Sequence, residues 1–157
     1  MKRIVIALCI LAGCTNAPTE TEVPHWSAVK LLREQHEREL TEWERMVMAI
    51  ALTESRFNPS AVGAANDTGI LQLTPVYVAE VNRVSGTDYI REDAFDIGKS
   101  LEMFALMQEH YNVGKDINYA IYLHNKSDAY KRKVLENMET VSRYEALRTK
   151  LIENNHD

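Results

Sequence analysis

Apolar residues recur three and four positions apart over most of this chain, which is the spacing of one face of an α-helix. Alternation of the kind that predicts a β-strand is confined to one very short stretch, residues 87–91. The pattern therefore predicts a mainly α fold in which short turns separate the helices. The expected helices cover residues 27–40, 42–56, 75–85, 97–111, 117–123 and 128–153.

Residues that cap helices stand before several of these segments. Thr41 with Glu44 three positions later fits a capping box, and Pro75 occupies the first position of its helix. Asn58-Pro59 is expected to end the helix before it, because proline disfavours helical backbone at the preceding residue. The other expected N-caps are Asp96, Asp116 and Ser127. Residues 60–68 and 87–95 are expected to be loops.

The first residues have the form of an export signal. Met1-Lys2-Arg3 is basic, residues 4–11 are apolar but too few to span a bilayer, and small residues precede Cys14. This shape predicts a secretory signal over residues 1–13. Leu11-Ala12-Gly13-Cys14 also resembles the lipobox of bacterial lipoproteins. That resemblance implies a lipid on Cys14, export to the bacterial cell envelope, and an anchor on the periplasmic side of the outer membrane; in an ordinary signal peptide the cysteine would be incidental.

A tether is expected between this anchor and a single folded domain. Residues 14–25 are polar, lack periodicity and include two prolines, so the domain is expected over residues 26–157. Cys9 lies inside the signal, which leaves Cys14 as the one cysteine of the mature chain. An internal disulfide and a cysteine-rich zinc site are therefore excluded.

Composition and charge exclude several classes of function. The 157 residues allow one domain, and 45% hydrophobic with 26% charged residues is ordinary for a globular protein. The net charge of −5 becomes about −7 once Lys2 and Arg3 are removed with the signal. Such a balance argues against a nucleic-acid partner, which usually needs a basic face. The sequence also has no metal-binding histidine pair, no Gly-rich phosphate loop and no Gly-x-Ser-x-Gly elbow.

Glu54 is the residue whose position is unusual for its chemistry. Trp43, Val47, Ile50 and Glu54 follow one another at steps of four, three and four, which puts them on one side of the predicted helix. A carboxylate that faces a core or cleft loses solvation when charged, and this favours the protonated form that a general acid needs. A solvated glutamate or a buried ion-pair partner, with Arg56 for instance, would fit the same position.

Two motifs surround this glutamate. Residues 51–62 read ALTESRFNPSAV, and residues 69–75 read GILQLTP. Their order and spacing resemble the first two motifs of the soluble lytic transglycosylase family, part of the lysozyme-like superfamily. A third motif is only partial: in residues 120–126, AIYLHNK, Asn125 matches, but His124 stands where the family usually has tyrosine and no glycine follows. Tyr130, with Val134-Leu135 after it, matches the later tyrosine and apolar pair.

The resemblance implies a lysozyme-like domain of short helices around a glycan-binding cleft, and it gives roles to individual residues. Glu54 would be the catalytic acid, and Ser55 beside it would orient either Glu54 or the substrate. Gln72 would form a hydrogen bond with the sugar next to the scissile bond, and Gly69 would let backbone and substrate approach closely. Tyr130 is also expected among the substrate-binding residues.

The third motif carries the remaining expectations. Asn125 would hold the loop that lines the cleft or touch the glycan. His124 would either replace the usual tyrosine as the hydrogen-bond partner of Glu54 or face solvent. Tyr122 is a second candidate for that partner, with packing in the core as its alternative.

The implied reaction is cleavage of the MurNAc–GlcNAc β-1,4 bond of peptidoglycan with one carboxylate. Glu54 would protonate the glycosidic oxygen and then, as carboxylate, take the proton of the MurNAc 6-hydroxyl, which closes a 1,6-anhydro ring. This chemistry needs no metal or cofactor. The implied partners are the glycan strands and, through Cys14, the membrane; the sequence does not separate wall remodelling from service to an envelope-spanning secretion or conjugation machine.

Two alternative functions stay open at this stage. Asp67 lies between the motifs, and if it faced Glu54 across the cleft the enzyme would be a hydrolytic lysozyme with two carboxylates. Asp67 equally fits a turn in the loop Asn66-Asp67-Thr68-Gly69. The altered third motif also allows a lipoprotein that binds peptidoglycan without cutting it.

Overall fold

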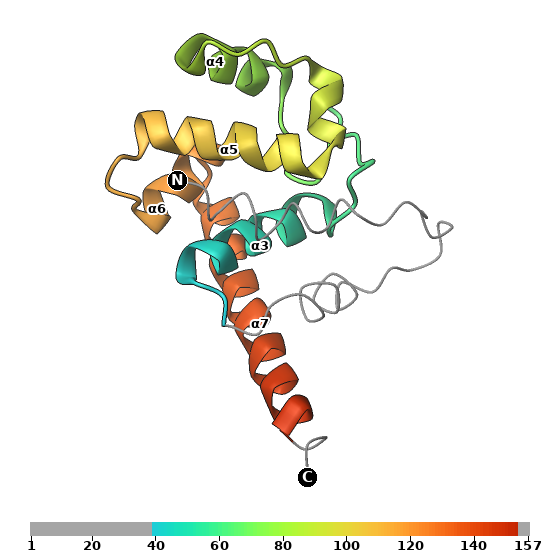
Figure 1. Cartoon of the computed structure of the whole chain (residues 1–157), viewed down its shortest axis with the longest axis vertical. Coiled ribbons are helices and arrows are strands. Elements are labelled where there is room, and N and C mark those ends of the chain that lie inside the picture. The colour runs from blue at the N-terminus through green and yellow to red at the C-terminus, as the bar shows by residue number, and fades with distance from the viewer. Residues whose placement is uncertain (1–38, 154–157) are drawn as a thin grey trace.

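The computed structural model describes residues 39–153, with side chains for residues 39–147. The predicted signal (1–13), the lipidated Cys14, the tether (14–25), most of the helix expected over 27–40 and residues 154–157 lie outside this range. In Figure 1, α3 (Glu42–Ser55) lies across α7 (Asp128–Glu153), and α4 (Pro75–Ser85) lies beside α5 (Ile97–Tyr111). The shorter α6 (Ile117–His124) contacts both α3 and α7. Residues 39–153 contain no named strand, so the mainly α prediction is confirmed.

Helix α3 begins where the capping box predicted. Thr41 Oγ1 accepts a hydrogen bond from the Glu44 backbone N–H at 3.2 Å, and the Glu44 carboxylate accepts one from the Thr41 N–H at 2.7 Å. The helix ends at Ser55, earlier than Asn58-Pro59 required, because Arg56 and Phe57 turn into the left-handed region with φ of 53° and 65°. This early end places Glu54 in the last turn of α3, directly before the loop.

The loop after α3 is held by two isolated β-bridges, which pair Val62 with Thr68 and Thr68 with Leu73. Ile70, Leu71 and Leu73 are buried, as expected for the compact apolar piece between the loop and α4. Helix α4 then begins at Pro75 with Thr74 as its N-cap and ends before Gly86, as predicted.

The expectation of a loop over residues 87–95 was wrong in its second half. Arg91–Phe95 forms a short 3₁₀ helix, η2, that packs against α5. Its start is fixed by Asp93, whose carboxylate accepts a hydrogen bond from the Ile90 backbone N–H at 2.9 Å. Ala94, the fourth residue of η2, is buried against Gly69, so η2 packs closely on the loop that follows α3.

Helices α5 and α6 are both capped by the predicted aspartates. Asp96 Oδ1 accepts from the Lys99 N–H at 2.9 Å, and Asp116 Oδ1 accepts from the Tyr119 N–H at 2.7 Å. Helix α6 extends to His124, one residue beyond the predicted end. That last residue is consequently held by helical backbone, and its ring turns inward.

Helix α7 starts after Ser127 and contributes Val134 and Val141 to the core. Leu147, which the apolar pattern also put on this face, is 55% exposed. The central part of the core comes from α3, whose residues 46–51 are all buried between α7 and the rest of the domain. Within residues 39–153, no helix combines the length and apolar character needed to cross a membrane.

Candidate active site

Glu54 lies between two anchored neighbours at the end of α3. On one side, Thr53 Oγ1 accepts a hydrogen bond from Asn137 Nδ2 of α7 at 2.9 Å and donates to the Ala49 carbonyl at 2.7 Å. On the other side, Ser55 Oγ donates to the Ile70 carbonyl at 2.8 Å. These bonds tie the last turn of α3 to α7 and to the loop, so the backbone of Glu54 is held from both sides.

The Glu54 side chain faces His124. Oε1 of Glu54 lies 3.2 Å from Nε2 of His124, and the two side chains are 18% and 4% exposed. Of the two alternatives for His124, the structure therefore shows the inward one, and His124 does not face solvent. The carboxylate keeps partial access to the outside while the imidazole is enclosed.

Three aromatic rings from three helices surround His124. Its ring centroid lies 5.9 Å from Tyr77 of α4, 6.0 Å from Phe104 of α5 and 6.0 Å from Tyr130 of α7. The contact with Tyr77 is edge-on, and the Tyr130 ring stacks at 30°. We refer to Glu54, His124, Tyr77, Tyr130 and Phe104 as the Glu54 cluster.

The cluster holds three buried polar atoms without a hydrogen-bond partner among the described residues. They are the hydroxyls of Tyr77 and Tyr130 and Nδ1 of His124. Burial raises the pKa of Tyr77, and burial followed by the nearby Glu54 charge raises the pKa of Tyr130. The Tyr130 hydroxyl lies close to Glu54, whose charge and hydrogen-bonding side chain both contribute to this raised pKa, although no hydrogen bond of normal geometry joins the two groups. Both phenols stay protonated and neutral, so they can serve as hydrogen-bond donors to a ligand at this site.

Ser55 and Gly69 hold the protein's own backbone together. The Ser55 hydroxyl donates to the loop and does not contact the Glu54 carboxylate through any hydrogen bond of the described residues. Gly69 has a φ of 79°, and a Cβ there would lie 1.7 Å from the Ala94 carbonyl oxygen. Sequence reasoning expected Gly69 to admit substrate, but its open side is occupied by η2.

The side-chain amide of Gln72 donates its hydrogen bonds to backbone carbonyls of its own loop. Nε2 donates to the Gly69 carbonyl at 2.8 Å and to the Ala61 carbonyl at 3.1 Å. The predicted sugar contact would therefore have to use Oε1, which accepts no hydrogen bond from the described residues. Gln72 itself has a left-handed φ of 49°, so the loop is strained around the residue that fastens it.

Tyr122 and Asn125 lie away from the carboxylate. Tyr122 is 46% exposed and stacks on Tyr119 with centroids 6.1 Å apart, so core packing was the wrong alternative for it. It stands two residues before His124, about 200° around the helix, and therefore on nearly the opposite side. Asn125 is exposed, and its Oδ1 accepts from the Ser127 N–H at 3.0 Å, which shapes the link between α6 and α7.

Asp67 turns its carboxylate to its own loop. Oδ1 accepts from the Ala65 backbone N–H at 3.0 Å, and the carboxylate fills the space beside Gly63. This is the turn role that the sequence allowed. No hydrogen bond or ion pair joins Asp67 to Glu54 in the described part of the chain.

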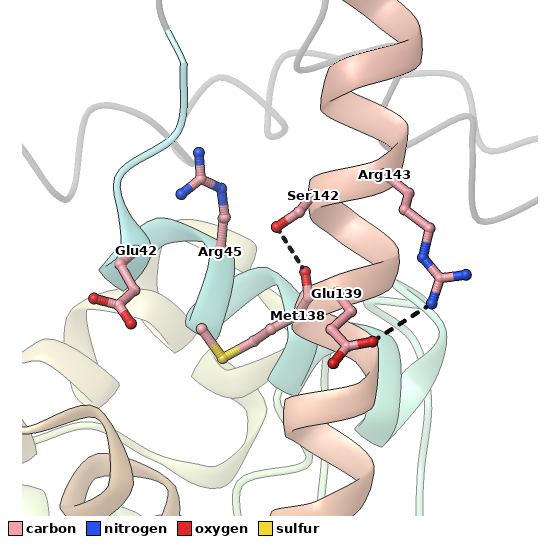
Figure 2. Close-up of a pocket in the computed structure, with 6 residues that line it drawn as sticks. All are labelled: Glu42, Arg45, Met138, Glu139, Ser142 and Arg143. Atoms are coloured by element: carbon pink, nitrogen blue, oxygen red, sulfur yellow. Dashed lines mark hydrogen bonds and ion pairs between the residues drawn. The ribbon is translucent and has the colours of Figure 1, made fainter.

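A surface pocket of about 610 Å³ lies elsewhere, beside the first turn of α3 (Figure 2). Its walls come from α3 and from the middle of α7, and they carry both positive and negative charges. The lining residues are Glu42, Arg45, Met138, Glu139, Ser142 and Arg143. Twelve residues of helix, roughly 18 Å, separate Glu42 from Glu54, so this pocket does not contain the Glu54 carboxylate. Among the described residues there is also no group of three or more side chains that could hold a metal ion.

Sequence reasoning did not identify Tyr77 or Asn137 as part of the site. Asn137 stands three residues after Val134 on the apolar face of α7 and is 9% exposed. A polar residue on an apolar stripe is the same signal that singled out Glu54, so Asn137 could have been found. Tyr77 carries no such signal, because its place beside His124 depends on how α4 packs.

Comparison with known proteins gives one match. The family model described as Transglycosylase SLT domain matches residues 32–146, which is more than half of the chain. Neither the curated proteins nor the solved structures contain a match.

Proposed function

The chain belongs to the transglycosylase SLT family, whose lysozyme-like fold agrees with the helical structure, and from this membership we propose that it cleaves the MurNAc–GlcNAc β-1,4 bond of peptidoglycan. Family membership supports peptidoglycan lytic transglycosylase activity in general. The observation that supports Glu54 as the reacting residue is its partly exposed carboxylate, 18% accessible and 3.2 Å from the enclosed His124 ring.

In the proposed reaction Glu54 acts first as an acid. Its proton moves to the glycosidic oxygen, the bond from that oxygen to MurNAc C1 breaks, and the GlcNAc part leaves as an alcohol. Glu54, now a carboxylate, takes the proton from the MurNAc 6-hydroxyl while that oxygen bonds to C1. The products are a 1,6-anhydro-MurNAc end and a protonated Glu54, so the acid is restored without water.

The lytic route is favoured over hydrolysis by the place of Asp67. An inverting hydrolase needs a second carboxylate about 6.5–9.5 Å from the acid, and a retaining one about 5–5.5 Å. Asp67, the candidate for that role, is engaged by the Ala65 N–H and by the turn at Gly63. A single carboxylate that works as acid and then base fits these contacts better.

Several neighbouring residues are proposed to bind the glycan. Tyr130 offers a buried hydroxyl donor near Glu54, and Gln72 offers Oε1 to a sugar hydroxyl or N–H. Asn125 would hold the loop between α6 and α7. Tyr122 and its stacked neighbour Tyr119 present exposed rings on which a sugar face can stack. Gly69 and Ser55 would act through the loop and not by touching the sugar.

The place of action is proposed from the N-terminal sequence. A signal over residues 1–13 and a lipid on Cys14 would anchor the domain in the cell envelope, on the periplasmic side of the outer membrane, with residues 14–25 as tether. Labelling with a palmitate analogue in cells tests this, and a Cys14→Ala variant should lose the label and leave the membrane fraction. Label retained in that variant would exclude Cys14 as the anchor point.

The enzymatic proposal is tested by digesting purified sacculi and measuring the masses of the products. Wild type should release 1,6-anhydro-muropeptides, Glu54→Gln should release none while keeping its helical circular dichroism spectrum, and Glu109→Gln, an exposed glutamate of α5, should match wild type. Reducing-end products alone would indicate hydrolysis. Sacculi that are bound but left uncut by wild type would indicate a binding protein.

A further inference from the structure

The Glu54–His124 pair contains a feature that the proposed reaction does not explain. His124 presents Nε2 to the carboxylate, while its other nitrogen, Nδ1, is buried without a partner among the described residues. A neutral imidazole carries its single proton on one of these two nitrogens, and the partners of each decide which.

The surroundings favour the proton on Nε2. A lone pair on Nε2 would face the negative oxygen of ionised Glu54 at 3.2 Å, whereas an N–H there makes a charge-assisted hydrogen bond. A proton on Nδ1 would be a buried donor with no acceptor among the described residues, and an unsatisfied buried donor is destabilising. A doubly protonated ring would place such a donor there as well.

The groups that face His124 from the neighbouring helices do not change this preference. They are Glu54 of α3, Tyr77 of α4, Phe104 of α5 and Tyr130 of α7. Of these, Glu54 carries the one carboxylate, and both tyrosines stay neutral because burial raises their pKa values. A neutral donor at Nε2 is thus matched to one acceptor, Oε1.

We propose that His124 is a positioning residue whose Nε2–H group holds Oε1 of Glu54, so that Oε2 is the oxygen that exchanges the proton with the substrate. This inference rests on the proposed function for its consequence but not for its geometry. Oε1 accepts the same hydrogen bond when Glu54 is protonated on Oε2 and when it is ionised. The acid therefore changes charge during the reaction without losing its anchor.

The direct test is the protonation of the ring, read by ¹⁵N NMR of the full chain labelled at histidine. The His124 signals should show a neutral ring with the proton on Nε2 at neutral pH. His124→Gln identifies the signals by their loss, and the exposed His110 serves as the reference histidine. A proton on Nδ1, or an imidazolium at that pH, overturns the proposal. Because this reading needs no activity, it stands apart from failure of the cleavage assay.

The kinetic test compares three replacements on soluble glycan strands. His124→Phe keeps an aromatic ring at this position but removes the Nε2–H donor. The kcat should therefore fall about 100-fold with KM nearly unchanged, as expected for a displaced acid. His124→Gln supplies a neutral N–H and His124→Tyr supplies a hydroxyl, and each should recover at least a tenth of the wild-type kcat. His110→Phe is the control for removal of a histidine and should match wild type.

Three outcomes would overturn the positioning role. The first is wild-type kcat in His124→Phe, and the second is a loss in His124→Gln as large as that in His124→Phe. The third is a kcat–pH profile of His124→Gln that lacks a limb present in wild type, since a titrating histidine and not a fixed donor would then be required. Thermal unfolding of each variant keeps a folding defect separate: His124→Gln and His124→Tyr still decide the question if His124→Phe does not fold.

Discussion

Gly69 and Gly86 form a natural pair for testing how closely η2 packs on the loop beside Glu54. Both have a left-handed φ, 79° and 70°. An alanine in this conformation is strained by about 1–2 kcal/mol. A Cβ at Gly86 would meet no atom within 4 Å, whereas a Cβ at Gly69 would lie 1.7 Å from the Ala94 carbonyl oxygen. The difference between the two alanine variants therefore isolates the contact with η2.

The expected magnitudes follow from these two terms. Gly86→Ala should lower the free energy of unfolding by about 1–2 kcal/mol, from backbone strain alone. Gly69→Ala adds the displacement of backbone in η2, an overpacking cost of about 1–3 kcal/mol, for a total of about 2–5 kcal/mol. Ala94 is fully buried, so its carbonyl cannot move without disturbing the packing of η2 on α5.

Urea unfolding followed by circular dichroism measures both losses, provided that the m-values stay equal. Gly69→Ala should also reduce cleavage more than Gly86→Ala at a temperature where both are folded, because Gly69 precedes the Ile70 carbonyl that accepts from Ser55. Equal losses of stability in the two variants would refute the close packing of η2 on Gly69.

Three further predictions concern other contacts. Thr53→Val leaves Asn137 Nδ2 buried without its acceptor and should lower the free energy of unfolding by about 1–3 kcal/mol. In a double-mutant cycle, the loss in Thr53→Val/Asn137→Leu should be smaller than the sum of the losses in the two single variants. The Arg83 guanidinium, and then the Tyr111 hydroxyl, lower the pKa of Glu80 from 4.5 to about 2. The resulting stabilisation is present above the unfolded value of 4.5 and is lost as the pH falls through about 2. The difference in melting temperature between wild type and Glu80→Gln should therefore shrink over that range, and a constant difference would contradict this prediction. Tyr122→Ala should raise KM for glycan strands about fivefold at unchanged kcat, because its ring is exposed and outside the Glu54 cluster; an unchanged KM would remove it from the binding surface.

The helix boundaries were predictable because the signals that set them are local. Thr41, Thr74, Asp96 and Asp116 each accept a hydrogen bond from a backbone N–H about three residues later, so a short stretch of sequence contains both partners. The 3₁₀ helix at Arg91–Phe95 escaped prediction because it is one short turn without apolar periodicity. Its stability comes from packing of Ala94 against a loop more than twenty residues away.

The site was predictable in part. The position of Glu54 on the apolar side of α3 followed from periodicity, and the family motifs pointed to Gln72, His124 and Tyr130. The roles of Ser55 and Gly69 did not follow, because the hydrogen bond from Ser55 to Ile70 and the close approach of Ala94 to Gly69 depend on how the loop folds back. The same holds for the three aromatic side chains that surround His124, because they come from three different helices, α4, α5 and α7.

Different contacts hold the backbone and the side chain of Glu54. Thr53 is tied to Asn137 and Ser55 to Ile70, so the backbone on either side of the acid is held by α7 and by the loop. The rotation of the Glu54 side chain is limited by its contact with His124, and the Tyr130 hydroxyl lies close to the same carboxylate. A general acid must keep its proton within hydrogen-bond reach of the leaving oxygen, so backbone anchors alone would leave the carboxylate free to turn away. We therefore expect the orientation of the proposed acid to depend on His124, the residue where the chain departs from the tyrosine usual in the family.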